Sequence, residues 1–393
     1  MATSQGSARI AWAGGQMPVL RSIRDRFGAD RPLEGVTVGA CLHVTAETAN
    51  LVQALTAGGA RVSLCAPNPL STQDDVVAAL RADGCDVHAT RGQDPAAGIA
   101  EVLATAPRVT LDDGADLVLG LHVAGDLPDG FLGGTEETTT GLSLLRRAAL
   151  RCPVLAVNEA RSERVFNDHH GTGQSVLDGI LRATNLLWPG RTVVVLGYGT
   201  TGRGIAARAR GAGAQVLVCE VDPVRALDAR MEGFDVLPAL EAAERGDVFI
   251  TVTGSRGVLR AEHFARMKDG AILANAGHFD VEIDLAALGA GEQVLPLVTQ
   301  HEVGGRRLNL LAQGRVVNLA AGQGHPASVM DISFALQALA VEHLVRCAGE
   351  LESGVQPVPE VLDREVARLK LVSLGVRIDD ITDEQRSYPG AGG

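Results

Sequence analysis

The feature that most constrains the fold is the regular alternation, from one end of the chain to the other, of short apolar runs with segments of helical periodicity. Short runs of apolar and β-branched residues are typical of parallel strands that are buried on both faces. Their alternation with helices indicates parallel sheets covered by helices and disfavours an all-α or an all-β domain. We therefore expect an α/β protein built from two doubly wound domains.

The predicted elements fall into two series. In the first half, helices are expected over residues 46–57, 72–82, 95–104 and 138–150, and strands over 36–42, 62–65, 85–88, 109–111 and 154–157. In the second half, strands are expected over 192–196, 216–219, 248–251, 272–275 and 316–319. Towards the C-terminus, the pattern predicts helices over 328–344 and 359–371 and a short strand over 375–378.

Glycines indicate where the two domains meet. Gly171, Gly173 and Gly179 interrupt the pattern before the second series of strands begins. The apolar helix over 328–344 is long enough to return to the first domain. We therefore expect a first domain over residues 1–173 that is completed by about 326–355, a second domain over 174–325 and a C-terminal segment over 356–393.

Composition and charge exclude several classes of partner. The 393 residues include 35 basic and 47 acidic side chains, for a net charge of −12, which offers no general attraction to nucleic acid or anionic lipid. The N-terminus has no apolar signal core, and no run approaches the roughly 18 apolar residues that a membrane span needs. The six cysteines include no Cys-x-x-Cys pair, so we expect a cytoplasmic protein with reduced thiols and no metal site.

A glycine-rich turn follows the first strand of the second series. That strand runs into Gly197, Gly199 and Gly202, a helix follows, and the next strand ends in Glu220, 21 positions after Gly199. Glycines at this spacing allow a tight turn and a close approach of a pyrophosphate to the N-terminal amides of the helix. Glu220 can accept hydrogen bonds from a ribose and repels a 2′-phosphate, so the pattern predicts NAD rather than NADP. The alternative is a glycine-rich turn that binds nothing.

Polar residues follow several of the predicted strands. Because ligands of open α/β sheets bind beyond the carboxyl ends of the strands, these positions are candidates for a binding site. Taken singly, each has an ordinary alternative, since loop histidines and aspartates often cap a helix or face water. Their convergence on one edge favours a site. They are His43, Asp112, Asp113, Asn158, Thr253 and His278.

A run of two glutamates and three threonines, Glu136 to Thr140, precedes a further predicted helix. Threonine or glutamate at this place is an ordinary N-cap arrangement. Helix capping and ligand binding are compatible here, so the run stays a candidate for both.

With these residues in view, the chain resembles the S-adenosylhomocysteine hydrolase (adenosylhomocysteinase) family over nearly its whole length. The matching stretches are LHVTAET at 42–48, STQD at 71–74, LDDG at 111–114, EETTTG at 136–141, GYG at 197–199, GHFDVEID at 277–284, NL at 318–319 and GHP at 324–326. The resemblance implies a substrate domain and a Rossmann NAD-binding domain that close on a hinge, with an adenine nucleoside bound between them. It also implies a homo-oligomer, either a dimer or a tetramer.

The resemblance further implies a reaction sequence. Oxidation of the 3′-carbon by NAD makes a ketone, the ketone acidifies the 4′-hydrogen, and loss of that proton expels the 5′ substituent to leave a 4′,5′-alkene. The family then adds water and reduces the ketone. By the same resemblance Thr45 and Glu47 hold the adenine, Glu137 holds the ribose hydroxyls, and Asp113 with His43 carries the proton transfers.

Other positions match the family's site by resemblance only. The implied catalytic residues also include Asn167, Asp168, His278 and His325. Gly324 and Met330 are implied to contact the substrate. The implied NAD-binding residues are Thr138, Thr139, Thr140, Gly197, Gly199, Thr200, Thr201, Gly202, Glu220, Asn275 and Asn318.

One departure from the family affects the redox step. Where the family reads Lys-Ser-Lys-Phe-Asp-Asn, this chain reads Glu-Arg-Val-Phe-Asn-Asp, so Glu163 replaces the catalytic lysine and Asn167 and Asp168 are exchanged. A carboxylate cannot mimic the charge of an ammonium, while Asp168 is still a candidate base. The only lysines, Lys268 and Lys370, are far from these motifs in sequence, and we expect no relocated lysine. Nearby arginines at 161 and 164 can supply charge but do not release a proton.

Two further departures concern the tail and the leaving group. The chain ends without the Lys- and Tyr-containing tail that the family passes into a neighbouring subunit's NAD site, so NAD is expected to be held less completely. Ala66 and Asp75 stand where the family has an asparagine and a histidine beside the amino-acid part of its substrate. A changed leaving-group pocket is expected.

Three functions are compatible with this pattern. The first is a nucleoside dehydratase that stops at the 4′,5′-alkene, as nucleoside-antibiotic tailoring would use. The second is an ordinary S-adenosylhomocysteine hydrolase that tolerates the changes and yields adenosine and homocysteine. The third is an inactive NAD-binding regulatory protein, against which the retained His43, Asp113, Glu137, His278 and His325 argue.

Overall fold

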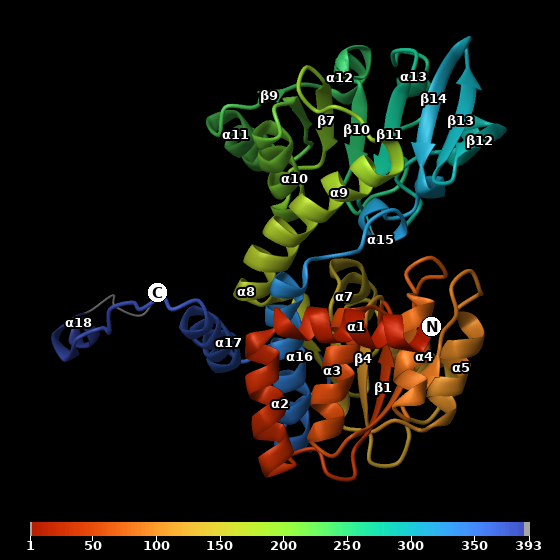
Figure 1. The fold of residues 1–393 in the computed structure, drawn as a ribbon. Helices are drawn as coiled ribbons and strands as arrows, with labels where there is room; N and C mark the ends of the chain where they lie inside the picture. Colours follow the sequence, from red (N-terminus) through yellow and green to blue (C-terminus); the bar gives the residue numbers. More distant parts are fainter. Residues whose placement is uncertain (1, 278, 389–393) are drawn as a thin grey trace.

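The computed structural model describes residues 2–277 and 279–388 and shows two lobes, each built around one sheet and covered by helices (Figure 1). The lobes are joined by a continuous helical segment and by a second crossing that leads into α16 (Ala327–Arg346). The expected α/β architecture with two mainly parallel sheets is confirmed.

The first sheet is wholly parallel, with strand order β15-β6-β5-β4-β1-β2-β3. Its strands are β1 (Thr37–Cys41), β2 (Arg61–Cys65), β3 (Asp86–His88), β4 (Val109–Asp112), β5 (Gly133–Glu136), β6 (Pro153–Ala156) and β15 (Gly354–Pro357). The connecting helices are α3 (Ala46–Ala57), α4 (Asp74–Ala82), α5 (Ala96–Ala104), α6 (Asp116–Ala124) and α7 (Thr139–Leu145). The order reverses direction at β1 and β4, the place where open α/β sheets form a binding crevice.

The second sheet has the order β12-β13-β14-β11-β10-β7-β8-β9. Its strands are β7 (Thr192–Leu196), β8 (Gln215–Cys219), β9 (Asp235–Val236), β10 (Val248–Thr251), β11 (Ala271–Asn275), β12 (Gly291–Leu295), β13 (Val298–Val303) and β14 (Arg306–Leu311). Its helices are α10 (Thr200–Gly211), α11 (Pro223–Met231), α12 (Ala239–Arg245), α13 (Ala261–Phe264) and α14 (Leu285–Leu288). β7, β8, β10 and β11 form a parallel core, and β12 to β14 add an antiparallel edge.

Several predicted elements are wrong. The expected strand over 316–319 is instead helix α15 (Val317–Ala320), because its apolar side chains pack on α9 (Gly173–Thr184) and only Val316 bridges to the sheet. Residues 375–378 form no strand, and the helix expected over 138–150 ends at Leu145. Strands β5, β9, β12, β13, β14 and β15 were not predicted. β5 begins with two glycines and β12 is exposed along its whole length, so neither carries an apolar pattern.

The first connection between the lobes is one helical segment. It consists of α8 (Arg161–Glu163), a π-helix over Arg164–Thr172 and α9. A Cβ at Gly204 would overlap the carbonyl oxygen of His169, so this glycine lets α10 pack closely against the π-helix. α9 contributes Val176 and Ile180 to the core of the second lobe, which supports a domain boundary near 173. The predicted domain bounds stay a prediction.

Helix α16 belongs to the core of the first lobe. It packs against α2 (Pro18–Asp30), α3 and α17 (Glu360–Ser373). By length and composition it is the one helix among residues 2–277 and 279–388 that could cross a membrane, but 72% of its apolar window is buried inside the protein. Its Asp331 accepts hydrogen bonds from the backbone N–H groups of Val19 (3.3 Å) and Leu20 (2.8 Å) and pairs with Lys370 at 2.8 Å. This cluster joins three helices.

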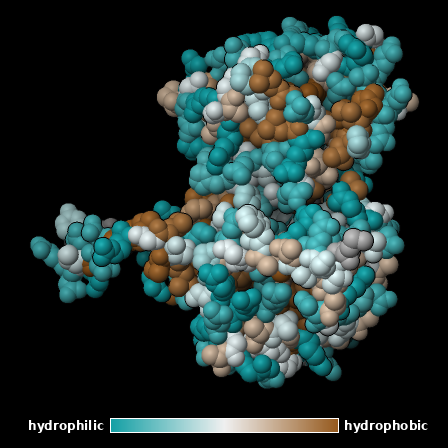
Figure 2. All heavy atoms as spheres, viewed as in Figure 1, coloured by the Kyte–Doolittle hydropathy of each residue, from teal (hydrophilic) through white to brown (hydrophobic). Residues whose placement is uncertain are grey.

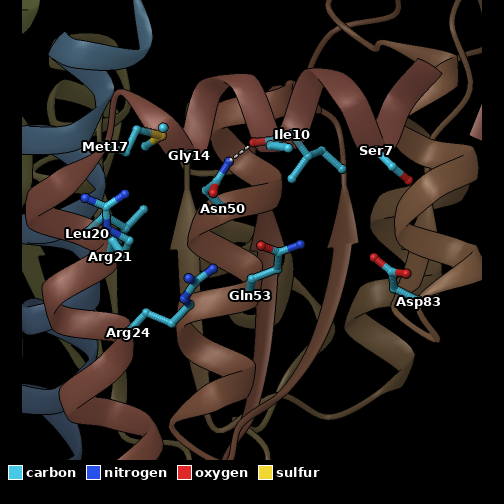
Figure 3. Close-up of a pocket in the computed structure, with 12 residues that line it drawn as sticks. Ser7, Ile10, Gly14, Met17, Leu20, Arg21, Arg24, Asn50, Gln53 and Asp83 are labelled. Atoms are coloured by element: carbon cyan, nitrogen blue, oxygen red, sulfur yellow. Dashed lines mark hydrogen bonds between the residues drawn. The ribbon is translucent and has the colours of Figure 1, made fainter. Parts of the chain in front are cut away.

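A surface pocket of about 420 Å³ lies between α1 (Ala2–Gly15), α2 and α3 (Figure 3). At its rim Asn50 donates a hydrogen bond to the carbonyl oxygen of Ile10 at 3.0 Å. A Cβ at Gly14 would lie 2.5 Å from the Asn50 oxygen, so α1 approaches α3 closely at this point. None of the site residues expected from the sequence lines this pocket.

The C-terminal arm, α17 and α18 (Asp383–Ser387), extends sideways from the first lobe (Figure 1). Val366 on α17 is buried against the lobe, whereas other apolar side chains of the arm are exposed. Figure 2 shows an apolar surface at the root of the arm. The exposed side chains are Val361, Val372, Leu374, Val376, Ile378, Ile381 and Tyr388.

Replacing Lys370 with methionine tests the ion pair that holds α17. Asp331 keeps its two backbone donors but loses its counter-ion where its side chain has no exposed surface, so we expect the free energy of unfolding to fall by about 3 kcal/mol. The matched control is Lys268→Met, because the other lysine pairs with Asp247 near the surface and its loss should cost less than about 1 kcal/mol. Equal losses in urea unfolding would contradict this assignment.

Candidate active site

A cavity of about 1720 Å³ lies between the two lobes, at the carboxyl edges of both sheets. Most of the residues implied by the sequence line it, while Gly202 and Asn275 stand behind its wall and His278 lies outside the described residues. The expected residues that line the cavity are His43, Thr45, Glu47, Asp113, Glu137, Thr138, Thr139, Thr140, Asn158, Asn167, Asp168, Gly197, Gly199, Thr200, Thr201, Glu220, Thr253, Asn318, Gly324, His325 and Met330.

Strand register brings the polar residues of the first lobe together. Cys41 is paired with Asp112, Asp112 with Glu136, and Glu136 with Ala156, so β1, β4, β5 and β6 end in line. The residues that follow these strands therefore meet at one edge. They are His43, Asp113, Glu137 and Asn158.

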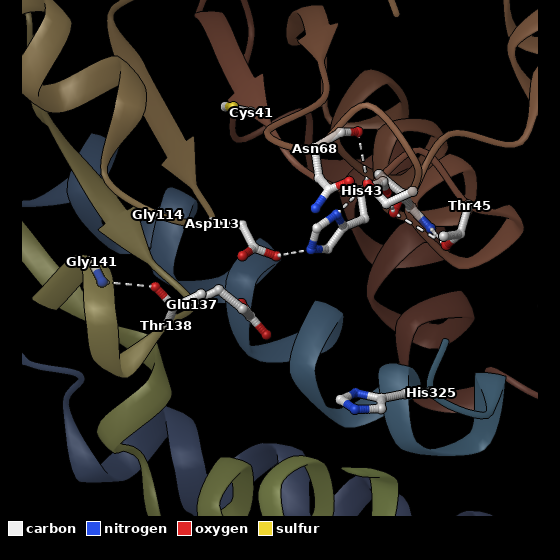
Figure 4. Close-up of polar contacts among 12 residues, drawn as sticks. Cys41, His43, Thr45, Asn68, Asp113, Gly114, Glu137, Thr138, Gly141 and His325 are labelled. Carbon is white, nitrogen blue, oxygen red and sulfur yellow. Dashed lines mark hydrogen bonds and ion pairs between the residues drawn. The ribbon is translucent and has the colours of Figure 1, made fainter. Parts of the chain in front are cut away.

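Two of them form a proton-transfer pair (Figure 4). The Nε2 atom of His43 lies 3.3 Å from Oδ2 of Asp113, and Nδ1 lies 2.6 Å from the hydroxyl of Ser71. The hydroxyl and the carboxylate hold the imidazole ring in one orientation. An imidazole beside a carboxylate suits acid and base catalysis at neighbouring atoms of a bound sugar.

The carboxylates just before these residues have a structural role. Asp112 accepts hydrogen bonds from the N–H groups of Leu117 (2.8 Å) and Val118 (3.0 Å) at the start of α6, and burial raises its pKa to about 7. Glu136 accepts hydrogen bonds from the N–H groups of Gly114 and Ala115. Because successive strand residues point to opposite faces, Asp113 and Glu137 are left directed at the cavity.

A second pair of carboxyl groups lies deeper. Glu137 accepts a hydrogen bond from the Gln337 side chain, and Glu163 accepts one from the hydroxyl of Ser333 at 2.8 Å. Burial raises the pKa of Glu137 to about 7 and raises the pKa of Glu163 well above its usual range. Sequence analysis missed Ser333 and Gln337. Their spacing of four residues on one face of an otherwise apolar helix is the signal that could have found them.

The π-helix supplies the two exchanged residues. Asn167 is buried and donates a hydrogen bond to Ser333 at 3.0 Å. Asp168 lines the cavity, and burial raises its pKa to about 6 against the opposing charge of Arg164. Asn167 thus supports the carboxyl pair, and Asp168 is the one of these two residues that presents a charge to the cavity.

His325 is a neutral imidazole. Burial lowers its pKa to about 4, and its Nε2 atom lies 3.0 Å from the hydroxyl of Thr172. Figure 4 places it across the cavity from Glu137 and His43. A second cavity of about 910 Å³ shares Glu47, Gly324 and His325 with the main one. The two cavities therefore adjoin at this end of the site.

Thr45 and Glu47 begin α3 at the same end. Thr45 is the N-cap residue, 3.4 Å from the Thr48 amide nitrogen, and Glu47 follows in the first turn. Burial raises the pKa of Glu47. Burial has removed water from the Thr45 and Glu47 side chains. Hydrogen bonds between these side chains and the edge of a nucleobase would take the place of that water.

The glycine-rich turn of the second lobe forms a close cradle. Gly197 has φ of 106°, and a Cβ there would lie 2.7 Å from the Val252 carbonyl oxygen, while a Cβ at Gly202 would overlap the Gly197 carbonyl. The Glu220 carboxylate is held by the N–H groups of Tyr198 (2.7 Å), Val221 (2.7 Å) and Asp222 (3.0 Å). A fixed carboxylate beside an open helix N-terminus is the arrangement that a dinucleotide requires.

The other implied cofactor residues differ in what their side chains do. Thr138 caps α7 by accepting a hydrogen bond from the Gly141 N–H at 2.9 Å, and Thr139 donates to Asn158 at 2.8 Å. The Oδ1 atom of Asn318 is buried without a hydrogen-bond partner among the described residues. The amide group of a nicotinamide ring would satisfy this atom, so the residues present fit NAD.

Asn275, behind the cavity wall, bonds to backbone groups of the described residues. Its nitrogen donates to the carbonyl oxygens of Phe279 (2.8 Å) and Gly314 (2.9 Å), and its oxygen accepts from the Gly277 N–H at 2.8 Å. Both ends of the side chain are therefore used to hold the loop that follows β11.

Comparison with known proteins agrees with this site. A family model described as S-adenosyl-L-homocysteine hydrolase matches residues 1–130, and one described as its NAD binding domain matches residues 168–324. An adenosylhomocysteinase from Aquifex aeolicus is 53% identical, over 98% of this chain and 95% of the relative. An S-inosyl-L-homocysteine hydrolase from Methanopyrus kandleri is 52% identical, over 98% and 94%. An adenosylhomocysteinase from Gloeobacter violaceus is 51% identical, over 98% and 93%.

Likeness in fold extends to more distant proteins. The crystal structure of a dipicolinate synthase polypeptide from Bacillus halodurans superposes with a TM-score of 0.52 at 15% identity, covering 80% of this chain and 99% of that one. At such low identity the comparison shows a similar fold and nothing more. The relatives above, in contrast, match 98% of this chain in sequence. This chain belongs to the S-adenosyl-L-homocysteine hydrolase family and is an NAD-dependent enzyme.

Proposed function

We propose that this enzyme is a nucleoside dehydratase: it oxidises the 3′-carbon of an adenine nucleoside, removes the 4′-proton, expels the 5′-hydroxyl as water to leave a 4′,5′-alkene, and then returns the hydride to the 3′-carbon. The observation that carries the proposal is the buried Glu163 in place of the family's lysine, next to an intact pair of His43 and Asp113. His43 and Asp113, which the elimination would use, are retained. The residue that assists the redox step in the family is replaced by Glu163, and the residues beside the leaving group have changed.

Residues of both lobes position the reactants. NAD, when bound, accepts the hydride of the 3′-carbon. The glycine turn at 197–202, Thr138 to Thr140, Glu220 and Asn318 are proposed to hold it, and Asn275 acts on it through the loop that it fixes. Thr45 and Glu47 are proposed to bind the adenine, with Gly324 and Met330 beside them.

The elimination needs one proton acceptor and one proton donor on the same side of the sugar. In the proposed step the 4′-carbon–hydrogen bond breaks, its electron pair forms the 4′,5′ double bond, and the 5′-carbon–oxygen bond breaks. Asp113 and His43, 3.3 Å apart, can take the 4′-proton and deliver a proton to the departing hydroxyl, which leaves as water. Asp168 and His325 line the same cavity and are proposed to contact the sugar and the leaving group.

The leaving-group side favours water over an amino-acid thiol. Asp75, which replaces a family histidine, is paired with Arg9 at 2.8 Å. A carboxylate that is already paired with an arginine cannot replace the imidazole of the family, so the contact that the resemblance implies for the amino-acid part of a homocysteine substrate is lost. A free 5′-hydroxyl needs no such contact.

The ordinary hydrolase is the second candidate, and identity above 50% to two adenosylhomocysteinases favours it. One relative is named as an S-inosyl-L-homocysteine hydrolase, so related sequences accept different purines. We propose adenine here because an ionised Glu47 accepts a hydrogen bond from an amino group and repels a carbonyl oxygen. The contact between His43 and Asp113 argues against an inactive regulatory protein.

The exposed apolar side chains of the C-terminal arm and the free cysteine thiols support proposals about assembly and location. We propose that the exposed apolar side chains of the C-terminal arm are covered by a second copy of the chain, in a dimer or a tetramer. All six cysteines are free thiols, which supports a cytoplasmic enzyme. The use of the product in nucleoside-antibiotic tailoring is part of the same proposal.

Replacing Glu220 with glutamine tests the NAD site. The amide keeps the size of the side chain but loses the charge that strengthens hydrogen bonds to ribose hydroxyls, so we expect NAD affinity to fall about 10- to 100-fold and the preference for NAD over NADP to weaken. Asp269→Asn, which removes a surface carboxylate paired with Arg307, is the control and should bind NAD normally. Isothermal titration measures both, and unchanged NAD binding by E220Q would refute the assignment.

Asp113→Asn and His43→Ala should each slow elimination about 100-fold or more while substrate-dependent NADH formation stays measurable, because oxidation precedes proton removal. The first lobe offers a matched control in Asp86 and His88, a second Asp–His pair at 2.8 Å that does not line the cavity. D86N and H88A should behave as wild type. If D113N and H43A bind the nucleoside but give no NADH absorbance, the roles are wrongly assigned.

The reaction itself is tested with two substrates in deuterated water. A dehydratase converts an adenine nucleoside with a free 5′-hydroxyl into a product lighter by one water and cleaves S-adenosylhomocysteine poorly. Returned starting material should carry deuterium at the 4′-carbon, because the proton is removed reversibly. Mass spectrometry reads both results. Rapid release of homocysteine, with no alkene from any free nucleoside, would establish the ordinary hydrolase instead.

A further inference from the structure

Two buried carboxyl groups lie together at the floor of the site. Glu137 follows β5 and lines the cavity, and Glu163 ends α8 behind it with no exposed surface. The two groups interact directly, and the charge of Glu137 raises the pKa of Glu163. Two ionised carboxylates have only acceptor atoms, so such a contact requires a hydrogen on one of them.

The surrounding hydrogen bonds all point toward the pair. The Gln337 amide nitrogen donates to Oε2 of Glu137, and its oxygen is occupied by the Thr135 hydroxyl at 2.6 Å. The Ser333 hydroxyl donates to Oε1 of Glu163 at 2.8 Å, and its own oxygen accepts from Asn167 at 3.0 Å. Each carboxyl group thus receives one donor from α16.

The remaining oxygen of each carboxyl group has no such donor. Oε1 of Glu137 and Oε2 of Glu163 are buried. No N–H or O–H group of the described residues donates a hydrogen bond to either oxygen. A single proton between these two oxygens satisfies both. Leaving both unsatisfied and both charged would cost far more than protonating one of them.

The charged groups that face the pair do not replace that proton. Asp113 from the loop after β4 and Asp168 from the π-helix are acidic. Both raise the pKa of Glu137, and Asp168 also raises the pKa of Glu163. His325, from the loop before α16, is neutral, and His43 is paired with Asp113. Arg164, on the π-helix, is half exposed 3.7 Å from Glu159.

We propose that Glu137 and Glu163 hold one proton between them at neutral pH, and that this pair is the acid–base group for a sugar hydroxyl in place of the family's lysine. The second half of the proposal rests on the proposed function, because it requires the sugar to lie against Glu137. When the hydroxyl oxygen–hydrogen bond breaks, its proton passes to the ionised carboxylate, and the pair goes from one proton to two. The proton returns when the ketone is reduced.

Burial explains why the pair keeps its proton. It raises the pKa of Glu137 to about 7 and that of Glu163 well above its usual range. The folded protein therefore binds one more proton than the unfolded chain around pH 7, where unfolded glutamates are ionised. It follows that the pair contributes stability at low pH, and that this stability is lost as the pH rises through the folded pKa.

The first experiment needs no substrate. At pH 7 the infrared difference spectrum between wild type and Glu163→Gln should contain a protonated carboxyl band, because subtraction removes the absorption of other carboxyl groups such as Asp112, whose pKa is also about 7. The glutamine keeps an acceptor for Ser333 and a donor for Glu137, so the fold is retained. The control is Glu342→Gln, which removes a buried carboxylate paired with Arg26 and whose difference spectrum should lack this band. Absence of the band from the E163Q difference spectrum overturns the proposal.

Proton uptake gives a second, independent measurement. From the pH dependence of urea unfolding, wild type should release about one more proton on unfolding near pH 7 than E163Q does. Identical proton release overturns the shared proton even if E163Q proves less stable for other reasons.

The catalytic half is tested by the redox step alone. With bound NAD, the substrate-dependent formation of NADH should be about 100-fold slower in E163Q than in wild type. In wild type this rate should rise with pH as the accepting carboxyl group ionises, and E163Q should shift that part of the pH profile. An unchanged rate and pH profile overturns the acid–base role. Failure of the dehydratase proposal is recognised separately, because a missing alkene leaves the infrared, unfolding and NADH results unaffected.

Discussion

The site depends on the register of four parallel strands. Because Cys41, Asp112, Glu136 and Ala156 are aligned across β1, β4, β5 and β6, the residues that follow them are delivered to one edge of the sheet. A shift of one residue in β4 or β5 would turn Asp112 or Glu136 to the cavity and bury the groups that now face it. The chemistry of the enzyme is therefore set by hydrogen bonds of the backbone.

Burial of charge is the second constraint, and the protein meets it in different ways. Asp112 and Glu136 receive backbone N–H groups from the start of α6, and Asp331 receives backbone donors together with Lys370. Glu137 and Glu163 have neutral side-chain donors on one side only. That difference separates carboxylates that hold the fold from a carboxyl pair that is able to exchange a proton.

Much of the fold could be predicted from local pattern, and the failures have a common cause. Strands with buried apolar runs, such as β1 and β7, were predicted because the run itself reports burial. β5 and β12 were missed because glycines and exposed polar residues carry no such signal, and their pairing is decided by neighbours far away in sequence. The apolar run at 316–319 is compatible with a strand or with a helix. Its packing against α9 selects the helix.

The sequence by itself determined the family, the glycine turn with Glu220, and the presence of Glu163 where a lysine is expected. Only the tertiary structure decided what Glu163 contacts, since Ser333 and Gln337 reach the carboxyl pair from a helix about 170 and 200 residues further along the chain. It also assigned Asn275 to a loop and Lys370 to an ion pair. Residue type fixes which protons a side chain can carry, but its charge in the folded protein depends on solvent and on partners that no local pattern specifies.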